Sequence, residues 1–390
     1  MNDRKFLLPT FLLAAVIVLC FTIGFLVARI AYDPPTDLPE EFNTLGEVWQ
    51  SLQDYYVNED ALDPEVLAQG AIDGLLEALD DPYTSYLNPD MYELEWSAFE
   101  GSYEGIGAFV TMEDGELIVV SPIAGGPAEE NGVKAGDRIL EVNGESTAGL
   151  TLTEALLLIR GPEGTWVTLL ILHDGETAPI EIEILRQEIQ LETVSTEMLT
   201  DEIARIHITH FSQNTYEEFV DILLEAYANG AEGIVLDLRN NPGGYLHVVV
   251  DVAGEFLDGG IVLYQENADG TVEEEKASSG GLATDLPLVV LVDEGSASGS
   301  EVLAGALQDR DRAQVVGSVT YGKGSVNLML ELSDGSALYV TTARWLTPDG
   351  HLIEGIGLTP DFEVEITEDD ILNERDPQLD CAIDDLESQL

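Results

Sequence analysis

Three serines stand two residues apart between an apolar run and a stretch with helical spacing: Ser296, Ser298 and Ser300. A strand, a turn of small residues and a helix can expose a nucleophile at a rigid corner and aim backbone N–H groups at a developing oxyanion. The turn is not a GxSxG elbow, because residue 297 is an alanine. Ser298-x-x-Glu301 is also typical of a helix capping box, so this stretch by itself favours an ordinary N-cap over a nucleophile.

A lysine between two glycines, Lys323 in the segment TYGKGS, follows Ser298 by 25 residues. The chain has only four lysines, and the GxxxxGK[ST] spacing of a phosphate loop is absent. A lysine accepts a proton from a serine only as a neutral amine, so burial must outweigh any nearby carboxylates. Residues 315–329 contain no Asp or Glu, which is consistent with a general base. A solvated loop lysine is the alternative.

A third candidate is the segment VLDLRNNPGGYL at residues 235–246, in which an apolar strand runs into a turn. Gly243 and Gly244 permit positive φ angles and a close approach of the backbone to other groups. The segment therefore predicts either a plain tight turn or a loop that supplies an N–H group to an oxyanion.

Taken together, DLRNNPGG, EGSASGSEVLAGALQD, YGKGSV and TTARWLTPDGHLIEGIGLTPDFEV resemble the carboxyl-terminal processing peptidases, or tail-specific proteases. These are serine proteases with a Ser–Lys dyad. The resemblance extends over about residues 40–380, because GAIDGLLEALDDPYTSYLNP also matches. It implies that Ser298 is the nucleophile, that Lys323 is its base, and that Ser296 and Ser300 have turn and cap roles.

The resemblance also implies an oxyanion hole and one departure from the family pattern. The N–H of Gly299 is one expected donor, and Gly243 or Gly244 supplies the other. The family usually has Gln four residues after the lysine, thought to orient it, whereas this chain has Asn327. The side chain of Asn327 is shorter by one methylene, or about 1.5 Å of reach. A weakened homologue that acts as a peptide-binding adaptor is therefore the alternative function.

Residues 104–190 resemble a PDZ domain, through YEGIGAF and GPAEENGVKAGDRILEVNG. Such domains take a peptide C-terminus as an added strand and hold its carboxylate with backbone N–H groups. The resemblance implies that Gly105, Ile106 and Gly107 form this carboxylate loop. Arg160 follows the helix of the module, and we expect it to pair with an acidic group of the protease core in a regulatory role.

The N-terminal segment Phe6–Val27 is an uncharged apolar run with Arg4 and Lys5 before it. Its 22 residues are enough to cross the hydrocarbon core of a bilayer. Basic residues before the run and an acidic chain after it place the body outside the cytoplasm. An uncleaved anchor is favoured over a cleaved signal, and the expected location is the cell membrane, single-pass.

The expected fold class is α+β/α/β multidomain. Apolar positions with helical spacing predict helices at 42–56 and 64–79, and alternating strands and helices from residue 203 predict a βαβ core. The expected organisation runs in this order: anchor 1–32, linker 33–40, helical region 41–103, PDZ domain 104–190, protease core 191–368, and an acidic segment, helical or frayed, at 369–390.

Composition limits the partners. With 15 Lys+Arg against 75 Asp+Glu the formal net charge is −60, which excludes nucleic acid as a partner because phosphates would be repelled. No metal or cofactor is expected. The expected partners are protein or peptide substrates with free C-termini, and the sequence leaves a homodimer open. A rival reading is a Ser–His–Asp hydrolase that uses His210 or His247 with Asp237.

Overall fold

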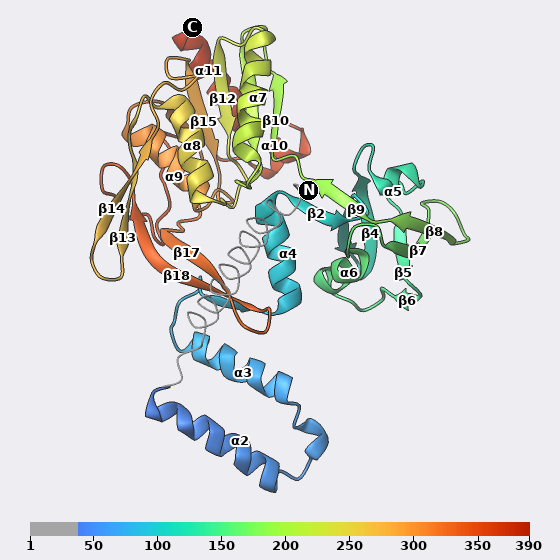
Figure 1. Cartoon of the computed structure of the whole chain (residues 1–390). Helices are drawn as coiled ribbons and strands as arrows, with labels where there is room; N and C mark the ends of the chain where they lie inside the picture. The colour runs from blue at the N-terminus through green and yellow to red at the C-terminus, as the bar shows by residue number, and fades with distance from the viewer. Residues whose placement is uncertain (1–37) are drawn as a thin grey trace, which may run out of the picture. The chain divides into compact units, whose positions relative to one another are not determined.

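The computed structural model describes residues 38–390, and the chain divides into two compact units that meet at Leu75/Leu76. The first unit holds the helix α2 (Asn43–Tyr55) and most of α3 (Pro64–Glu77), which ends two residues beyond the division (Figure 1). The short turns η1 (Glu40–Phe42) and η2 (Glu59–Ala61) precede them. Pro64 at the first position of α3 fits because its missing N–H would have no helical partner there. Both helices predicted for this region are confirmed.

The second unit begins with β1 (Ser85–Leu87) and α4 (Pro89–Glu100), which precede a β-rich module. The module has an antiparallel sheet in the order β3-β4-β5-β7-β8, with β6 on β5, and a separate pair of β2 and β9. The bounds of these elements are β2 (Ser102–Gly105), β3 (Ala108–Glu113), β4 (Glu116–Pro122), α5 (Pro127–Glu130), β5 (Arg138–Val142), β6 (Glu145–Ser146), α6 (Leu152–Ile159), β7 (Trp166–Leu172), β8 (Ile180–Leu185) and β9 (Gln187–Gln190).

The remaining core is built on a six-stranded sheet in the order β10-β11-β12-β15-β16-β19. All neighbours in it are parallel except β10 and β11. Its elements are β10 (Val194–Met198), β11 (Ile203–Ile208), α7 (Thr215–Ala228), β12 (Gly233–Asp237), α8 (Leu246–Phe256), β15 (Leu288–Val292), α9 (Gly299–Asp309), β16 (Gln314–Gly317), β19 (Phe362–Glu363), α10 (Glu368–Leu372) and α11 (Pro377–Gln389).

Both faces of this sheet are buried, which explains why β12 and β15 are continuous apolar runs. Phe219 of α7, Val249 of α8 and Leu303 of α9 belong to the cluster on one face. Ala382 and Leu386 of α11 belong to the cluster on the other face. The acidic C-terminal segment is therefore helical and packed in its last part, and the frayed alternative is wrong for α11.

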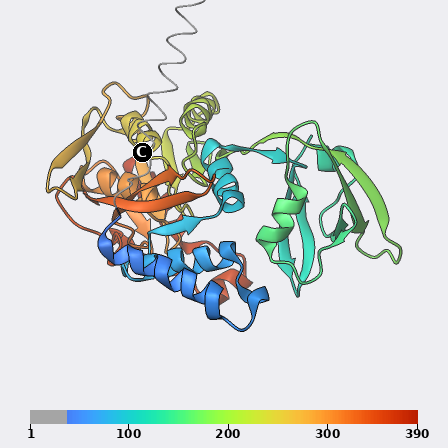
Figure 2. The ribbon, with the colours of Figure 1, turned by 60° about the horizontal axis from the view of Figure 1, so that its bottom comes forward.

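A second, antiparallel sheet is formed around the long strand β18 (Ala337–Leu346). Figure 2 shows β17 (Ser325–Glu331) beside β18, whose other edge pairs with β1 and with β13 (Gly260–Asn267). β13 continues into β14 (Val272–Ala277), a hairpin for which the sequence analysis predicted no strands. The glycine loop around Lys323 enters β17, so this sheet positions the lysine.

Among residues 38–390, no helix combines the length and apolarity needed to cross a bilayer. The predicted membrane segment, Phe6–Val27, lies outside the described residues. The mixed α/β multidomain architecture is confirmed.

Candidate active site

Ser298 lies at the corner between β15 and α9, where it is the residue before the first turn of the helix. Its backbone has φ 52° and ψ −110°. A non-glycine residue in this region of φ/ψ space costs free energy, and such residues concentrate at functional sites. The strained turn holds the Ser298 side chain half-buried at the edge of a pocket, whereas both neighbouring serines are fully buried.

The two flanking serines tie this corner to the loop after β12. The Ser296 hydroxyl donates to the carbonyl of Leu238 at 2.8 Å, and the Ser300 hydroxyl donates to the carbonyl of Asn241 at 2.8 Å. These bonds give both serines structural roles, as the resemblance implies. Of the three serines, Ser298 alone lines the pocket.

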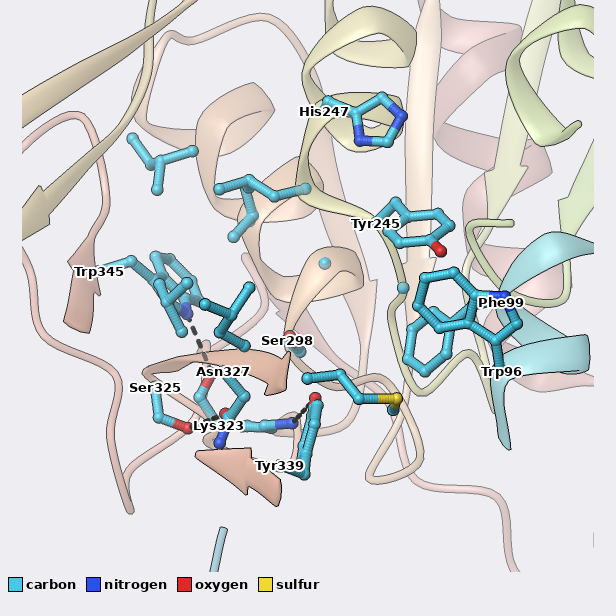
Figure 3. A pocket seen from close by; sticks show the side chains of 18 residues that line it. Trp96, Phe99, Tyr245, His247, Ser298, Lys323, Ser325, Asn327, Tyr339 and Trp345 are labelled. Atoms are coloured by element: carbon cyan, nitrogen blue, oxygen red, sulfur yellow. Dashed lines mark hydrogen bonds between the residues drawn. The ribbon is translucent and has the colours of Figure 1, made fainter. Parts of the chain in front are cut away.

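The pocket has a volume of about 380 Å³ and apolar walls (Figure 3). Its polar groups near Ser298 come from the loop that precedes β17 and from β17 and β18. Its lining residues are Trp96, Phe99, Gly244, Tyr245, Leu246, His247, Leu263, Ser298, Gly299, Val302, Lys323, Ser325, Val326, Asn327, Leu328, Met329, Tyr339 and Trp345.

The amine of Lys323 enters the same pocket between two tyrosine rings. Nζ lies 5.7 Å from the ring centre of Tyr83 and 5.3 Å from that of Tyr339. It donates to the Tyr339 hydroxyl at 3.4 Å (Figure 3). Within the described residues no hydrogen bond joins the Lys323 amine to the Ser298 hydroxyl. Burial, and then the Glu354 carboxylate, raise the pKa of Tyr83 to about 12, so this ring stays neutral beside the lysine.

The carboxylate of Glu301 joins the serine corner to the lysine loop. It is completely buried and accepts four hydrogen bonds. Oε2 accepts from the N–H groups of Ser298 at 2.7 Å and Lys323 at 3.0 Å. Oε1 accepts from the N–H of Gly322 at 2.7 Å and the hydroxyl of Thr320 at 2.5 Å. Sequence analysis recognised Glu301 only as part of a helix cap and missed this second role.

The structure separates the two glycines proposed as oxyanion donors. The N–H of Gly243 donates to the Asn241 side chain at 2.8 Å, so it is already engaged. Gly244 lines the pocket, and among the described residues its N–H and that of Gly299 have no hydrogen-bond partner. A Cβ added at Gly299 would lie 3.4 Å from the Gly244 nitrogen, so the two amides are close neighbours.

Asn327 lines the pocket but does not contact the lysine amine through a hydrogen bond. Its Nδ2 donates to the carbonyl of Tyr83 at 3.0 Å and to the Thr341 hydroxyl at 3.1 Å, and its Oδ1 accepts from Ser325 at 3.0 Å. The doubt raised by the shorter side chain is therefore supported, because the amide of Asn327 is engaged by Tyr83, Thr341 and Ser325. Tyr339, which the sequence analysis did not consider, is the side chain in reach.

The carboxylate loop predicted in the β-rich module joins β2 to β3. Gly105 pairs with Gln187 at the end of β2, Ile106 is buried in the core of the module, and Gly107 has φ 71°. The carbonyl of Ile106 accepts from the N–H of Ala128 at 2.7 Å, which fixes the loop against the start of α5.

Arg160 does reach beyond the β-rich module, but among residues 38–390 it forms no ion pair. Its Nη1 donates to the Ser97 hydroxyl of α4 at 2.7 Å, and its guanidinium carbon lies 4.3 Å from the ring centre of Tyr103. Burial lowers the pKa of Arg160, and the charges of Tyr103 and then Glu93 act against this effect. The expected ion pair is not formed among the described residues, where a hydroxyl and an aromatic face contact the guanidinium, and the expected regulatory role stays a prediction.

The residues of the rival Ser–His–Asp reading are not assembled. Asp237 is bound by two arginines, with Arg239 Nη2 at 2.7 Å and Arg205 Nη2 at 2.8 Å from its Oδ2. His210 contacts the Thr209 hydroxyl at 3.2 Å, and the ring of His247 packs beside Tyr245. Asp237 therefore serves an ion-pair network and not a catalytic histidine.

Comparison with known proteins identifies three segments of the chain. The family models of "Peptidase family S41", "PDZ domain" and "Activating protease CtpB N-terminal domain" match residues 202–364, 118–172 and 30–91. The chain is 39% identical over 328 residues to the "Carboxy-terminal processing protease CtpA" of Bacillus subtilis, covering 84% of this chain and 69% of that protein. It is 39% identical over 356 residues to the "Carboxyl-terminal-processing protease" of Synechocystis, covering 89% and 82%.

Among solved structures, the "Photosystem II D1 C-terminal processing protease" is similar to this chain with a TM-score of 0.51 and 29% identity. The match covers 84% of this chain and 94% of that one.

Proposed function

This chain belongs to the carboxy-terminal processing proteases, and we propose that it cleaves its substrates through a Ser298–Lys323 dyad. Membership of the family makes it a serine-type peptidase with a PDZ domain that binds the C-termini of peptide substrates. The observation that supports the dyad is that the side chains of Ser298 and Lys323 line the same pocket. They come from two loops, and the buried carboxylate of Glu301 accepts hydrogen bonds from both.

In the proposed mechanism the neutral Lys323 amine takes the proton of the Ser298 hydroxyl as the serine oxygen attacks the scissile carbonyl carbon. The carbonyl oxygen becomes an oxyanion, for which the N–H groups of Gly244 and Gly299 are the donors. The lysine ammonium then gives its proton to the leaving amine, and an acyl-enzyme remains. Water, deprotonated by the same amine, attacks the acyl group and restores Ser298.

The Lys323 amine needs another side chain to hold it in position. Because Asn327 is committed to Tyr83, Thr341 and Ser325, we assign the positioning of Lys323 to the Tyr339 hydroxyl.

The shape of the pocket supports a preference for an apolar side chain next to the scissile bond. Leu263, Val302, Val326 and Trp345 form its wall, and Trp345 is held by a bond from its Nε1 to the carbonyl of Lys323 at 3.0 Å. Burying one apolar side chain there contributes about 1.5–3 kcal/mol. Charged residues at this position would be excluded by the desolvation they require.

The membrane anchor and the domain limits belong to this proposal too. The apolar composition of Phe6–Val27 supports a single membrane span, with the catalytic body outside the cytoplasm. The substrates would then be extracytoplasmic as well. The proposed limits are those of the sequence analysis, with the PDZ domain at 104–190 and the protease core at 191–368. Protease accessibility of the body in intact cells tests the orientation.

The direct test of the function is cleavage of a loosely folded protein with a free apolar C-terminus by the full-length chain. We expect cleavage by the parent and none by Ser298→Ala or Lys323→Ala, and slower cleavage when the substrate tail is amidated. Cleavage by either variant at the parent rate would overturn the dyad.

A second candidate function is a tail-binding adaptor. The missing hydrogen bond between Ser298 and Lys323 and the engaged amide of Asn327 are the observations that favour it. Tail binding without cleavage by the parent chain would support the adaptor.

A further inference from the structure

The carboxylate loop of the PDZ domain leads into a strand with a free edge. β3 pairs only with β4 in its sheet, so its other edge is open to an added peptide strand. At the start of β3, Ala108 faces Pro122 while the N–H of Ile123 donates to the carbonyl of Gly107 at 2.9 Å. Ala108 is therefore in a non-hydrogen-bonded pair, and its N–H points away from β4, towards the open edge.

The side chain of Tyr103 lies in this loop. A Cβ added at Gly105 would stand 2.8 Å from Cε2 of Tyr103, so the ring packs directly on the glycine and would clash with any other residue there. Burial raises the pKa of this phenol, and the charge of Arg160 acts against that rise. The backbone N–H groups of Ala108 and then Gly107 act against it too, because they lie close enough to the phenol oxygen to stabilise the phenolate.

Arg160 holds the tyrosine from its other side. Its guanidinium carbon lies 4.3 Å from the ring centre, within the range of a cation–π contact. Its Cγ is 3.7 Å from the Cβ position of Gly105, and its Nη1 is anchored on Ser97. The ring is thus enclosed between the glycine of the loop and an arginine anchored on α4.

We propose that the Tyr103 hydroxyl occupies the place of the substrate's C-terminal carboxylate, so that a tail binds only by displacing it. The two N–H groups that face the phenol oxygen are those that a carboxylate would use. A carboxylate accepts stronger hydrogen bonds than a neutral phenol, so a tail can win the competition. The tail affinity is lowered by the fraction of molecules in which the loop is filled.

Displacement of the ring also has a consequence for Arg160. The guanidinium loses its aromatic partner at the moment when a carboxylate arrives beside it, and a charge-assisted bond can replace the cation–π contact. The competition therefore affects only ligands that enter the loop with a terminal carboxylate. Amidated or internal peptide segments do not displace the ring, and they bind weakly with or without the Tyr103 hydroxyl. This inference rests on tail binding by the PDZ domain and is independent of the dyad chemistry.

Binding of a fluorescent peptide tests the proposal without any cleavage. The full-length Ser298→Ala chain is compared with the Ser298→Ala/Tyr103→Phe chain, using one peptide with a free apolar C-terminus and its amidated form. Loss of one neutral competing hydrogen-bond acceptor should tighten binding of the free-acid peptide by about 2- to 10-fold. Binding of the amidated peptide should stay weak and unchanged.

The control is Tyr264→Phe, a half-buried tyrosine of β13 in the protease core, which should leave both affinities unchanged. A thermal melt shows that Tyr103→Phe is folded, and in the active chain the same change should lower KM for tailed substrates with kcat unchanged. Unchanged or weaker binding of the free acid by folded Tyr103→Phe would overturn the proposal. An equal gain for the amidated peptide would do so too.

Discussion

The buried carboxylate of Glu301 accepts a hydrogen bond from the backbone N–H of Lys323, 22 residues further along the chain, at 3.0 Å. The same oxygen accepts from the N–H of Ser298 at 2.7 Å. One atom therefore sets the spacing between the serine corner and the lysine loop. In the sequence Glu301 fits a helix cap. In the fold its carboxylate also links the serine corner to the lysine loop, and we call this link the brace of the proposed dyad.

Replacing this brace should damage stability and activity together. In the parent chain, N–H and O–H donors point at the two carboxylate oxygens of Glu301. In Glu301→Gln one of these oxygens is replaced by an NH₂ group, which cannot accept their hydrogen bonds. Each buried donor left unsatisfied costs about 1–3 kcal/mol. We expect the free energy of unfolding in urea to fall by about 2–4 kcal/mol. The matched control is the exposed Glu294→Gln in the same turn, which should lose less than about 0.5 kcal/mol. Equal stabilities of the two variants would contradict the brace.

The assignment of Tyr339 to lysine positioning predicts a loss of turnover in Tyr339→Phe. Its hydroxyl is the group 3.4 Å from Nζ, so its removal should lower kcat by about 2- to 10-fold and leave KM unchanged. In an Asn327→Gln background, where the amide extends about 1.5 Å further, the loss should be smaller. A change in KM alone, or the same loss in both backgrounds, would show that Tyr339 acts only in packing.

Gly244 is predicted to tolerate no side chain. A Cβ there would overlap the carbonyl of Phe211, and its φ of 148° is one that L side chains rarely adopt. Gly244→Ala should therefore displace the N–H that faces the pocket and lower kcat by about 10²-fold, the effect of losing one oxyanion donor. Gly270→Ala, also at positive φ but in open space, is the control for backbone strain alone. Comparable activities of the two variants would remove Gly244 from the proposed site.

The network around Asp237 predicts how stability depends on pH. Burial raises the pKa of this carboxyl, but Arg239 and then Arg205 outweigh burial, and the net pKa is lowered. A lowered folded-state pKa stabilises the fold above the unfolded value of about 3.9, and this contribution disappears as pH falls through the folded value. The free energy of unfolding should decrease from about pH 4 towards pH 2.

Asp237→Asn should flatten this decrease, and the exposed Asp201→Asn should not. Identical pH slopes in the parent and in Asp237→Asn would show that this carboxyl contributes nothing to acid unfolding.

Sequence alone indicated much of the site because the motifs around Ser298 and Lys323 are local. Short-range patterns also predicted the apolar strand in residues 235–246, which is β12, and the alternation of strands and helices in the core from residue 203. The hairpin β13–β14 escaped prediction, although the NADG segment between its strands is a turn signal. The alternation there is weak, because four of the six residues of β14 are exposed and three of the six are glutamates.

What the sequence could not predict depends on side chains that meet across the fold. The choice of Gly244 over Gly243 required the hydrogen bond from Gly243 to Asn241. The roles of Tyr103 and Tyr339 required their contacts with Arg160, at the end of α6, and with Lys323, in the loop before β17. Arg160 was expected to pair with an acidic group from its place after the helix of the module, but in the fold it contacts Tyr103 and Ser97.

The proposed mechanism depends on activation of Ser298 by Lys323. The most direct measurement is the rate at which a fluorophosphonate probe labels the full-length chain, followed by intact-mass and peptide mass spectrometry. We predict a single label on Ser298 that is absent in Ser298→Ala, and a labelling rate that falls by about 10²-fold or more in Lys323→Ala, the usual contribution of a general base. Labelling of a different serine, or an unchanged rate in Lys323→Ala, would contradict it.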